Sequence, residues 1–222
     1  MDGVIVDSHP AHRKSWHQFL QNLDKDVSDE ELEFILDGRK RSEILHHFLG
    51  ELSETELAEL GKMKDELFRQ IAFEVKPVPG VIDFLGELMR RRIKLGIATS
   101  ASRSRTAATL RDLKLTHCFA TVVTGDDVAE GKSSPAIYEL VCNRLGTEIC
   151  HSLVVEDAPP AVRTAKAAGF CCLGIGAGRG PGAKLRAAGA DHVIEDFVGF
   201  SLDDLKNDSQ TRSAQIRLAS RS

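Results

Sequence analysis

The feature that most constrains the fold is a change in the spacing of apolar residues near position 76. Up to residue 74 the spacing is helical, beginning with a stripe in which apolar side chains follow Trp16 at three, four and seven positions. From residue 93 to residue 194, short apolar strands alternate with helical segments. Alternation of this kind is typical of a parallel sheet with helices on both faces, and such a sheet carries its active site at the carboxyl ends of its strands.

The two patterns predict an α/β fold made of two parts. Residues 1–8 and 76–206 are expected to form a Rossmann-like core, in which a parallel sheet is the middle of three layers. Residues 9–75 are expected to form an inserted cap domain of four helices, two of which begin at S-x-x-E capping boxes. The polar tail at 207–222 lacks an apolar stripe, and we expect it to be disordered.

The strands of the core are predicted from short apolar runs bounded by turn residues. Together with the helices between them, they account for most of the chain after residue 92. The predicted strands are 93–99, 120–124, 153–155, 171–175 and 192–194, and the predicted helices are 103–114, 134–145, 159–168 and 184–188.

The first of these strands ends in a run of hydroxyl side chains. Thr99, Ser100 and Ser102 stand at a strand-to-helix junction, where free backbone N–H groups and a positive helix end favour a phosphate. The alternative is that Ser102 only caps the following helix. Both interpretations stay open for these residues taken alone.

Two further strand ends carry charged residues. Lys132 precedes the helix expected from residue 134, where it would either neutralise a phosphate or remain a solvated surface lysine. Glu156 and Asp157 directly follow an apolar strand, where adjacent carboxylates are costly to desolvate unless they bind a cation or a donor. Oxygen ligands of this kind suit Mg²⁺. The alternative is that Asp157 caps the helix that Pro159 opens.

Composition narrows the range of partners. The net charge is −4 and no long run of Lys or Arg occurs, which argues against nucleic acid. No apolar stretch approaches the roughly 20 residues that span a bilayer, so we expect no membrane partner. The five cysteines include no C-x-x-C pair and are typical of reduced thiols in a cytoplasmic protein.

Taken in chain order, these features resemble one family. The residues that carry the resemblance are Asp2, Gly3, Val4, Ser100, Lys132, Glu156 and Asp157. Each residue alone is a weak signal. Their order along the chain, with a helical insertion after the first three, is similar to that of the haloacid dehalogenase superfamily. More narrowly, the chain resembles its helical-cap (subfamily I) phosphatases and phosphomutases, the group that includes beta-phosphoglucomutase. The resemblance spans about residues 1–195.

The resemblance implies a role for each of these positions. In that family the first strand ends in D-x-D-G, whose first Asp attacks phosphorus and whose second Asp is the general acid and base. Asp2 matches the second Asp. Ser100 matches the hydroxyl that holds the phosphoryl group, and Lys132 the lysine that balances its charge, which phosphoryl transfer requires. The implied ligands of Mg²⁺ are Glu156, Asp157 and the backbone carbonyl of Asp2.

The cap is expected to supply specificity. The resemblance implies that His12 contacts the general acid and base and that Arg41 binds a second phosphate, with a solvated basic turn as the alternative for Arg41. Further substrate contacts are expected at Ala101, Ser102 and Ser104. The implied partner is a small phosphorylated metabolite, such as a sugar phosphate, bound by a monomer or weak dimer.

The position of the attacking Asp lies one residue before Met1. One hypothesis is a Mg²⁺-dependent phosphatase or phosphomutase that forms an aspartyl phosphate, with its first strand and nucleophile ahead of Met1. The other is a catalytically inactive relative that binds phosphorylated ligands or a protein partner. We favour the first because losing that strand would leave the middle of the sheet unpaired, at a cost above the roughly 5–15 kcal/mol that stabilise a domain. The 222 residues alone are therefore expected to show negligible turnover.

Overall fold

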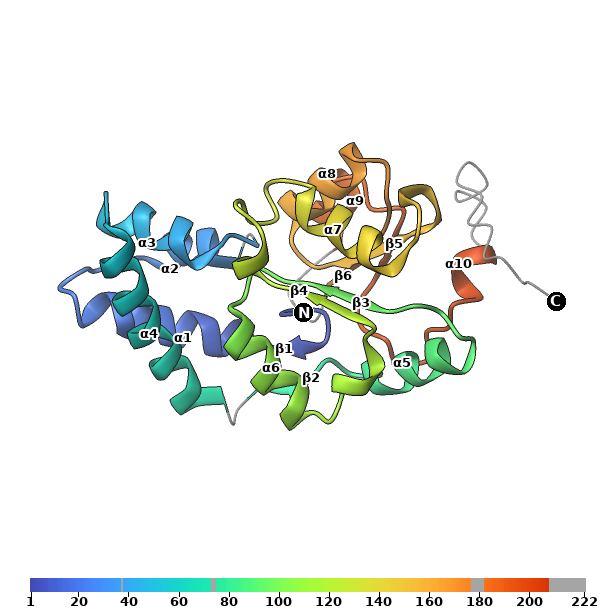
Figure 1. Cartoon of the computed structure of the whole chain (residues 1–222), viewed down its shortest axis with the longest axis horizontal. Helices are drawn as coiled ribbons and strands as arrows, with labels where there is room; N and C mark the ends of the chain where they lie inside the picture. Colours follow the sequence, from blue (N-terminus) through green and yellow to red (C-terminus); the bar gives the residue numbers. More distant parts are fainter. Residues whose placement is uncertain (37, 73–74, 177–181, 208–222) are drawn as a thin grey trace.

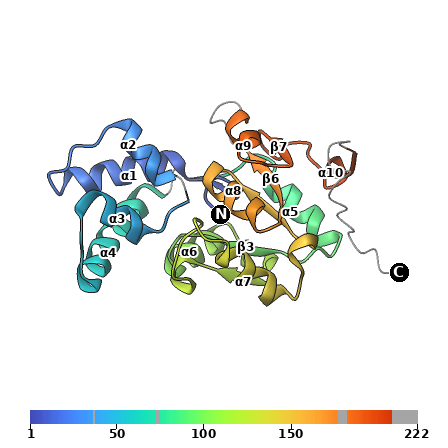
Figure 2. The same cartoon turned by 90° about the horizontal axis from the view of Figure 1, so that it is seen from above.

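The computed structural model describes residues 1–36, 38–72, 75–176 and 182–207. Helices α1–α4 gather at one end of the molecule, and the parallel strands with the later helices form the rest (Figures 1 and 2). The tail that we expect to be disordered lies, beyond residue 207, outside the described residues. No helix among the described residues is long and apolar enough to cross a membrane.

The helical part packs around a cluster of its own, centred on Trp16. Its elements are α1 (His9–Gln21), α2 (Asp29–Glu33), the 3₁₀ helix η1 (Phe34–Leu36), α3 (Arg41–Leu49) and α4 (Glu54–Ile71). Both predicted capping boxes are present, because Ser28 Oγ accepts from the Glu31 N–H and Ser53 Oγ accepts from the Glu56 N–H, each at 3.3 Å. These caps satisfy N–H groups that the first turn of a helix leaves without a partner.

The rest of the chain alternates strand and helix, as the sequence predicts. Its elements are β1 (Val6–Asp7), β2 (Lys76–Pro77), α5 (Val81–Arg90), β3 (Gly96–Ala98), α6 (Arg103–Asp112), η3 (Thr116–Cys118), β4 (Thr121–Val123), η4 (Gly125–Asp127), α7 (Ala136–Leu145), η5 (Ile149–His151), β5 (Leu153–Glu156), α8 (Pro159–Ala167), β6 (Cys171–Ile175), α9 (Ala183–Ala187), β7 (His192–Ile194) and α10 (Asp204–Asn207). The strand predicted at 93–99 is shorter than expected, because its ladder with β4 holds only three of these residues.

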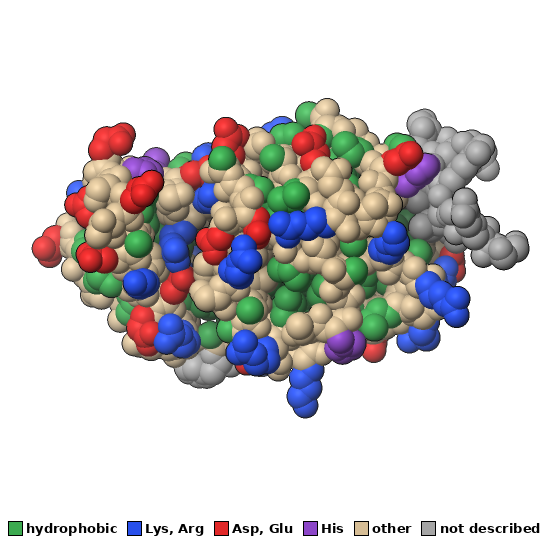
Figure 3. Space-filling view, in the orientation of Figure 1, with side chains coloured by type: hydrophobic (Ala, Val, Ile, Leu, Met, Phe, Trp, Pro, Cys, Tyr) green, Lys and Arg blue, Asp and Glu red, His purple; other side chains and the backbone are tan. Residues whose placement is uncertain are grey.

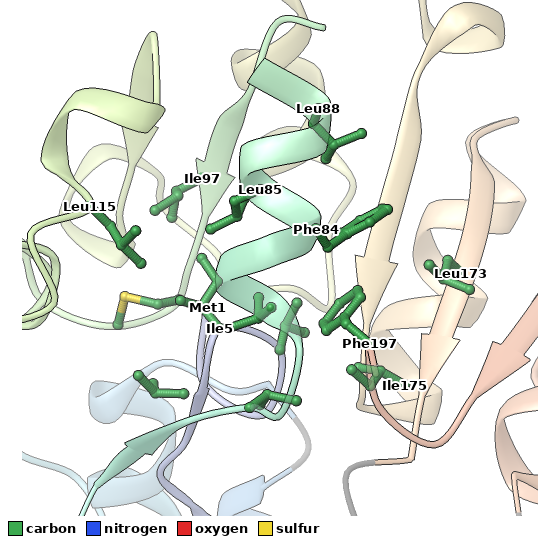
Figure 4. Packing of buried hydrophobic residues seen from close by; sticks show 14 of the residues in the cluster. Met1, Ile5, Phe84, Leu85, Leu88, Ile97, Leu115, Leu173, Ile175 and Phe197 are labelled. Carbon is green, nitrogen blue, oxygen red and sulfur yellow. The ribbon is translucent and has the colours of Figure 1, made fainter. Parts of the chain in front are cut away.

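The parallel strands confirm the predicted α/β class, but they form two ladders. β3 pairs in parallel with β4, while β5, β6 and β7 pair in parallel in that order. Within the described residues, no backbone hydrogen bond joins β3 to β5. Helices α7, α8 and α9 cover one face and α5 and α6 the other (Figure 1). On the second face, Leu85 of α5 points toward Ile97 of β3, and Phe84 stacks on Phe197 (Figure 4).

The chain passes between the two parts at β1 and β2. These short strands pair antiparallel, Val6 with Pro77 and Asp7 with Lys76, so both crossings lie side by side. The amino terminus lies in the middle of the molecule in both views (Figures 1 and 2). Met1 is only 5% exposed there. The first residues therefore stand between the core and the helical part, close to the carboxyl ends of the parallel strands.

Candidate active site

The core and the helical part meet at a pocket of about 100 Å³. Nine of the ten predicted site residues line it: Asp2, His12, Arg41, Ser100, Ala101, Ser102, Lys132, Glu156 and Asp157. Ser104 is the exception and corrects our prediction, because α6 turns its side chain toward solvent. Its Oγ lies 3.3 Å from Ser102 Oγ instead. The convergence of the others follows from the parallel strands, whose carboxyl ends share one edge.

Lys132 and Glu156 form a buried ion pair in this pocket. They are 6% and 2% exposed, and Lys132 Nζ donates to Glu156 Oε1. The same oxygen accepts a hydrogen bond from the Tyr138 hydroxyl at 3.0 Å. Burial lowers the pKa of Lys132, but the charge and hydrogen bond of Glu156 outweigh it, and the pKa lies above its ordinary value. Lys132 is a buried cation, so the alternative of a solvated surface lysine is wrong.

The second oxygen of Glu156 gives this pocket a place for a cation. Within the described part of the chain, Glu156 Oε2 is buried and has no hydrogen-bond partner. An unpaired buried carboxylate oxygen is costly, and Asp157 adds a second carboxylate to the same pocket. This set of hard oxygen donors fits Mg²⁺. The alternative role of Asp157 as a helix cap is wrong, because the N-cap of α8 is Ala158.

Gly3 allows the backbone to approach Asp157, and we expect it to tolerate no side chain. Its φ is +67°, and a Cβ would lie 2.1 Å from Asp157 Oδ2 and 2.6 Å from His9 Nε2. Gly50 has a similar φ of +83°, but no described atom lies within 4 Å of its Cβ position. Gly3→Ala should therefore lower the free energy of unfolding by about 2 kcal/mol more than Gly50→Ala. The difference comes from the steric overlap of the new Cβ with Asp157 and His9, because the backbone strain is similar at both positions. Urea denaturation measures both, and equal losses would contradict the prediction.

Asp2 is held by charged and polar partners. Arg105 donates from Nη1 and Nη2 to Asp2 Oδ1 and Oδ2, at 2.8 and 2.7 Å. Ser8 Oγ donates to Oδ1 at 2.6 Å. Burial raises the pKa of Asp2, but the charge and hydrogen bonds of Arg105 outweigh it and hold the pKa well below its usual range. Asp2 is therefore an ionised carboxylate near neutral pH.

His12 links Asp2 to the helical part, as the resemblance implies. Its Nε2 lies 3.4 Å from Asp2 Oδ1, and its Nδ1 lies 3.3 Å from Lys64 Nζ. Burial and then the charge of Lys64 lower the pKa of His12 to about 3, so the ring is neutral. A lysine ammonium only donates, so we assign the imidazole proton to Nε2, which donates to Asp2.

Lys64 is a buried cation that the sequence analysis missed. It is 2% exposed, and its Nζ lies 5.1 Å from the centroid of the Trp16 ring and 4.8 Å from that of Phe68. Cation–π contacts of this kind stabilise a desolvated ammonium. Its burial could have been predicted from its position on α4. The buried residues of this helix, Gly61, Lys64, Phe68 and Ile71, follow helical spacing.

Stability is expected to rise with pH because of Lys64. Burial, followed by repulsion from Arg105, lowers its pKa from 10.5 to about 7. Between these values the unfolded chain binds the additional proton, so the free energy of unfolding increases with pH. From pH 7 to pH 9 the gain should be about 2 kcal/mol larger than in the Lys64→Met variant. Urea denaturation at both pH values tests this, and identical pH dependence of the two proteins would contradict it.

Ser100 and Arg41 make contacts across the pocket. Ser100 Oγ donates to the carbonyl oxygen of Gly38 at 2.6 Å, which connects the core to the helical part. Arg41 Nη1 donates to Asp65 Oδ2 at 2.5 Å and to the carbonyl oxygen of Gly61 at 3.2 Å. Arg41 is thus partly buried and paired, and its alternative as a solvated turn residue is wrong.

Ser102 has both of the roles considered for it. Its Oγ accepts from the Arg105 N–H at 3.4 Å, which caps α6, and donates to Asp65 Oδ2 at 3.3 Å in the pocket. Arg105, which the sequence analysis did not name, is thereby fixed at both its backbone and its side chain. Its spacing of three residues from the cap places it on the same face of α6 as Ser102.

A family model of haloacid dehalogenase-like hydrolases matches residues 1–175. The phosphorylated carbohydrates phosphatase of Thermotoga maritima is 32% identical over 172 residues, which cover 77% of this chain and 79% of that protein. Fructose-1-phosphate phosphatase YqaB of Escherichia coli is 30% identical over 178 residues, covering 79% and 93%. A mutant of CbbY from Rhodobacter sphaeroides, solved in complex with xylulose-(1,5)bisphosphate, has a TM-score of 0.78 at 27% identity and covers 92% of this chain and 96% of that one. With most of its length matched, the chain belongs to the haloacid dehalogenase-like hydrolase family.

Proposed function

We propose that this chain serves Mg²⁺-dependent phosphoryl transfer, as a phosphatase or phosphomutase, on a small sugar phosphate or a similar metabolite through an aspartyl phosphate. The observation that carries the proposal is the meeting of Lys132, Ser100 and the unpaired Glu156 oxygen in one pocket. Phosphoryl transfer depends on positioning and on neutralising charge at the phosphoryl oxygens. The pocket supplies a buried cation, a hydroxyl donor and a carboxylate pair for these tasks.

The attacking carboxylate is proposed to belong to an Asp directly before Met1. The Met1 ammonium is buried, and burial and then the charge of Lys132 lower its pKa to about 6. Glu156, Asp2 and Asp157 act on it in the opposite direction. Their action on the Met1 amino group supports an Asp joined to Met1 as the nucleophile of the proposed reaction.

Each residue then has one task. Lys132 balances the charge of the nucleophile and the phosphoryl group, and Ser100 Oγ donates to a phosphoryl oxygen. In the second step Asp2 accepts a proton from the attacking water, and in the first step of the next turnover it gives that proton to the leaving oxygen. Arg105 favours the ionised form of Asp2, which the second step needs. Mg²⁺ bound by Glu156 and Asp157 would neutralise negative charge on the phosphoryl oxygens.

The substrate class is inferred from the helical side of the pocket and from the relatives. Arg41, Lys64, Asp65 and Arg105 all line this side, and such a set of polar donors and acceptors suits a polyhydroxylated substrate body. The two relatives named for phosphorylated carbohydrates and fructose 1-phosphate, and the CbbY complex with a bisphosphate, support a sugar phosphate.

The proposal is tested on a chain completed by a short apolar strand, Lys-Ala-Val-Ile-Phe-Asp, joined directly to Met1. We expect Mg²⁺-dependent release of phosphate from hexose phosphates, lost on chelation with EDTA. The matched control ends the same strand in Asn, which cannot form the aspartyl phosphate and should show no turnover. The unextended 222 residues should also show none. Assays with and without a bisphosphate primer separate a phosphomutase from a phosphatase.

Steady Mg²⁺-dependent hydrolysis by the Asn form, or by the unextended chain, would overturn the assignment of the nucleophile. If the Asp form binds inorganic phosphate by calorimetry but turns over no substrate, the inactive binding protein replaces the enzyme as the better conclusion.

A further inference from the structure

The guanidinium group of Arg41, at the start of α3, is held against α4. Its Nη1 donates to Asp65 Oδ2 at 2.5 Å and to the carbonyl oxygen of Gly61 at 3.2 Å. A Cβ on Gly61 would lie 2.6 Å from Arg41 Cζ, so a side chain there would displace the guanidinium group. Gly61 and Asp65 are four residues apart and lie on the same face of α4. This face of α4 therefore fixes where the charge of Arg41 stands.

Asp65 changes what Arg41 can bind. The side chains of Arg41 and Asp65 are 32% and 23% exposed, and both line the pocket. An anion that approached Arg41 would also approach the carboxylate of Asp65, which repels it. On the face that Figure 3 shows, acidic and basic side chains likewise lie intermixed where the helical part meets the core. A second phosphate is therefore disfavoured at Arg41.

Hydroxyl groups suit this pair better than a phosphate does. Within the described residues, Asp65 Oδ1 accepts no hydrogen bond and Arg41 Nη2 donates none. The pair thus offers an acceptor beside a donor, and a sugar hydroxyl both donates and accepts. Ser102 Oγ donates to Asp65 Oδ2 at 3.3 Å, which joins the pair to the strand end of the core. A ligand whose phosphate binds at Ser100 would have its body near this pair.

Two other cations of the pocket stand against aromatic rings. Lys64 Nζ lies 4.8 Å from the centroid of the Phe68 ring, and Arg39 Cζ lies 4.0 Å from that of Phe34. Both cations remain when Asp65 alone is replaced. A comparison of the unsubstituted chain with an Asp65 variant therefore isolates the effect of the carboxylate.

We propose that Asp65 is a specificity-determining residue, which accepts a hydrogen bond from a hydroxyl group of a sugar monophosphate and disfavours a second phosphate at Arg41. The inference rests on the proposed function and narrows its substrate class to phosphate esters with an uncharged, polyhydroxylated body. It also favours a phosphatase over a phosphomutase. A phosphomutase that passes a phosphoryl group from an aspartyl phosphate to a sugar monophosphate has to bind the resulting bisphosphate.

The test measures binding by calorimetry to the strand-completed chain whose added strand ends in Asn, because this form should not hydrolyse the ligands. The ligands are glucose 6-phosphate and glucose 1,6-bisphosphate, which differ in a hydroxyl or a phosphate at C1. We expect the monophosphate to bind the unsubstituted chain more tightly. Asp65→Asn should raise the affinity for the bisphosphate at least about tenfold, because the repulsion is removed. It should lower the affinity for the monophosphate about fivefold, because a hydroxyl bonds an amide oxygen less strongly than a carboxylate.

The matched control is Glu66→Gln, at the next position of α4. Glu66 pairs with Arg69, and neither residue lines the pocket. Its replacement should change neither affinity. An Asp65→Asn variant with an unchanged ratio of the two affinities would contradict the proposal, as would no binding of either ligand at millimolar concentration. Tighter binding of the bisphosphate by the unsubstituted chain would also contradict it, and this measurement holds even where Asp65→Asn fails to fold.

The form whose added strand ends in Asp separates this inference from the proposed function. There, Asp65→Asn should raise KM for glucose 6-phosphate while kcat changes less than about threefold, because Asp65 binds the body of the substrate and not the reacting group. If the affinity ratio shifts but the Asp form gives no turnover, the role of Asp65 stands and the enzymatic proposal fails. If the Asp form turns over and the ratio does not shift, only the role of Asp65 fails.

Discussion

Replacing Asp2 by Asn in the strand-completed chain is expected to lower kcat/KM for hexose phosphate hydrolysis by about 10²- to 10⁴-fold, the range for losing a general acid and base. Asn has the shape of Asp but neither gives nor accepts the transferred proton. The backbone carbonyl of Asp2, which the family resemblance implies as a metal ligand, is unchanged by the substitution, so Mg²⁺ affinity should be retained. Steady-state kinetics at several Mg²⁺ concentrations measure both quantities.

A matched control for this variant is Asp203→Asn. Asp203 also accepts from both guanidinium Nη atoms of an arginine, Arg91, at 2.9 and 2.5 Å. The pair lies between α5 and the segment before α10, and neither residue lines the pocket. Its loss should leave kcat/KM unchanged. An Asp2→Asn enzyme that keeps more than about a tenth of its activity would show that proton transfer uses another group.

Replacing Lys132 by Met should cost about 3–5 kcal/mol of unfolding free energy, because it leaves the buried charge of Glu156 without its partner. A domain is stabilised by only about 5–15 kcal/mol, so the variant is expected to lie near the limit of folding. Urea denaturation gives the difference directly. The hydroxyl of Tyr138 would remain as a donor to Glu156 Oε1, which keeps the loss finite.

The control for Lys132 is the exposed pair of Arg69 and Glu66 on α4. Arg69→Met should cost at most about 1 kcal/mol, because solvent screens a surface pair. In the double variant Lys132→Met/Glu156→Leu, part of the stability should return, since no uncompensated charge is left in the core. A Lys132→Met loss no larger than that of Arg69→Met would contradict the prediction.

The sequence allowed the core and the strand-end residues to be predicted for the same reason. In a parallel α/β sheet the carboxyl ends of strands converge, so Ser100, Lys132 and Glu156 could be expected near one another without coordinates. The capping boxes were equally readable, because Ser28 and Ser53 act within four residues of their partners. Helix capping, which acts within a few residues, and the convergence of strand ends in a parallel sheet thus account for most of the correct predictions.

Contacts between helices of different parts could not be predicted in this way. Arg105 reaches Asp2 across 103 positions, and Lys64 reaches His12 across 52. Both depend on how α6 and α4 lie against the first residues, which spacing alone does not determine. Ser104 is an example of a residue wrongly predicted to lie in the site. It is close to Ser102 in sequence, but its side chain is exposed.

Under the proposed function, the hydrogen bond from Ser100 to the Gly38 carbonyl would turn phosphate binding into an exchange. An arriving phosphate displaces the carbonyl as the acceptor, and one neutral hydrogen bond contributes about 1 kcal/mol net. The observed affinity should therefore be about fivefold weaker than the contacts of the phosphate alone would give. When inorganic phosphate departs, the carbonyl takes over the hydroxyl again, so the protein does not have to leave a buried donor unpaired. Weak retention of the product is therefore expected from an atom pair that also joins the core to the helical part.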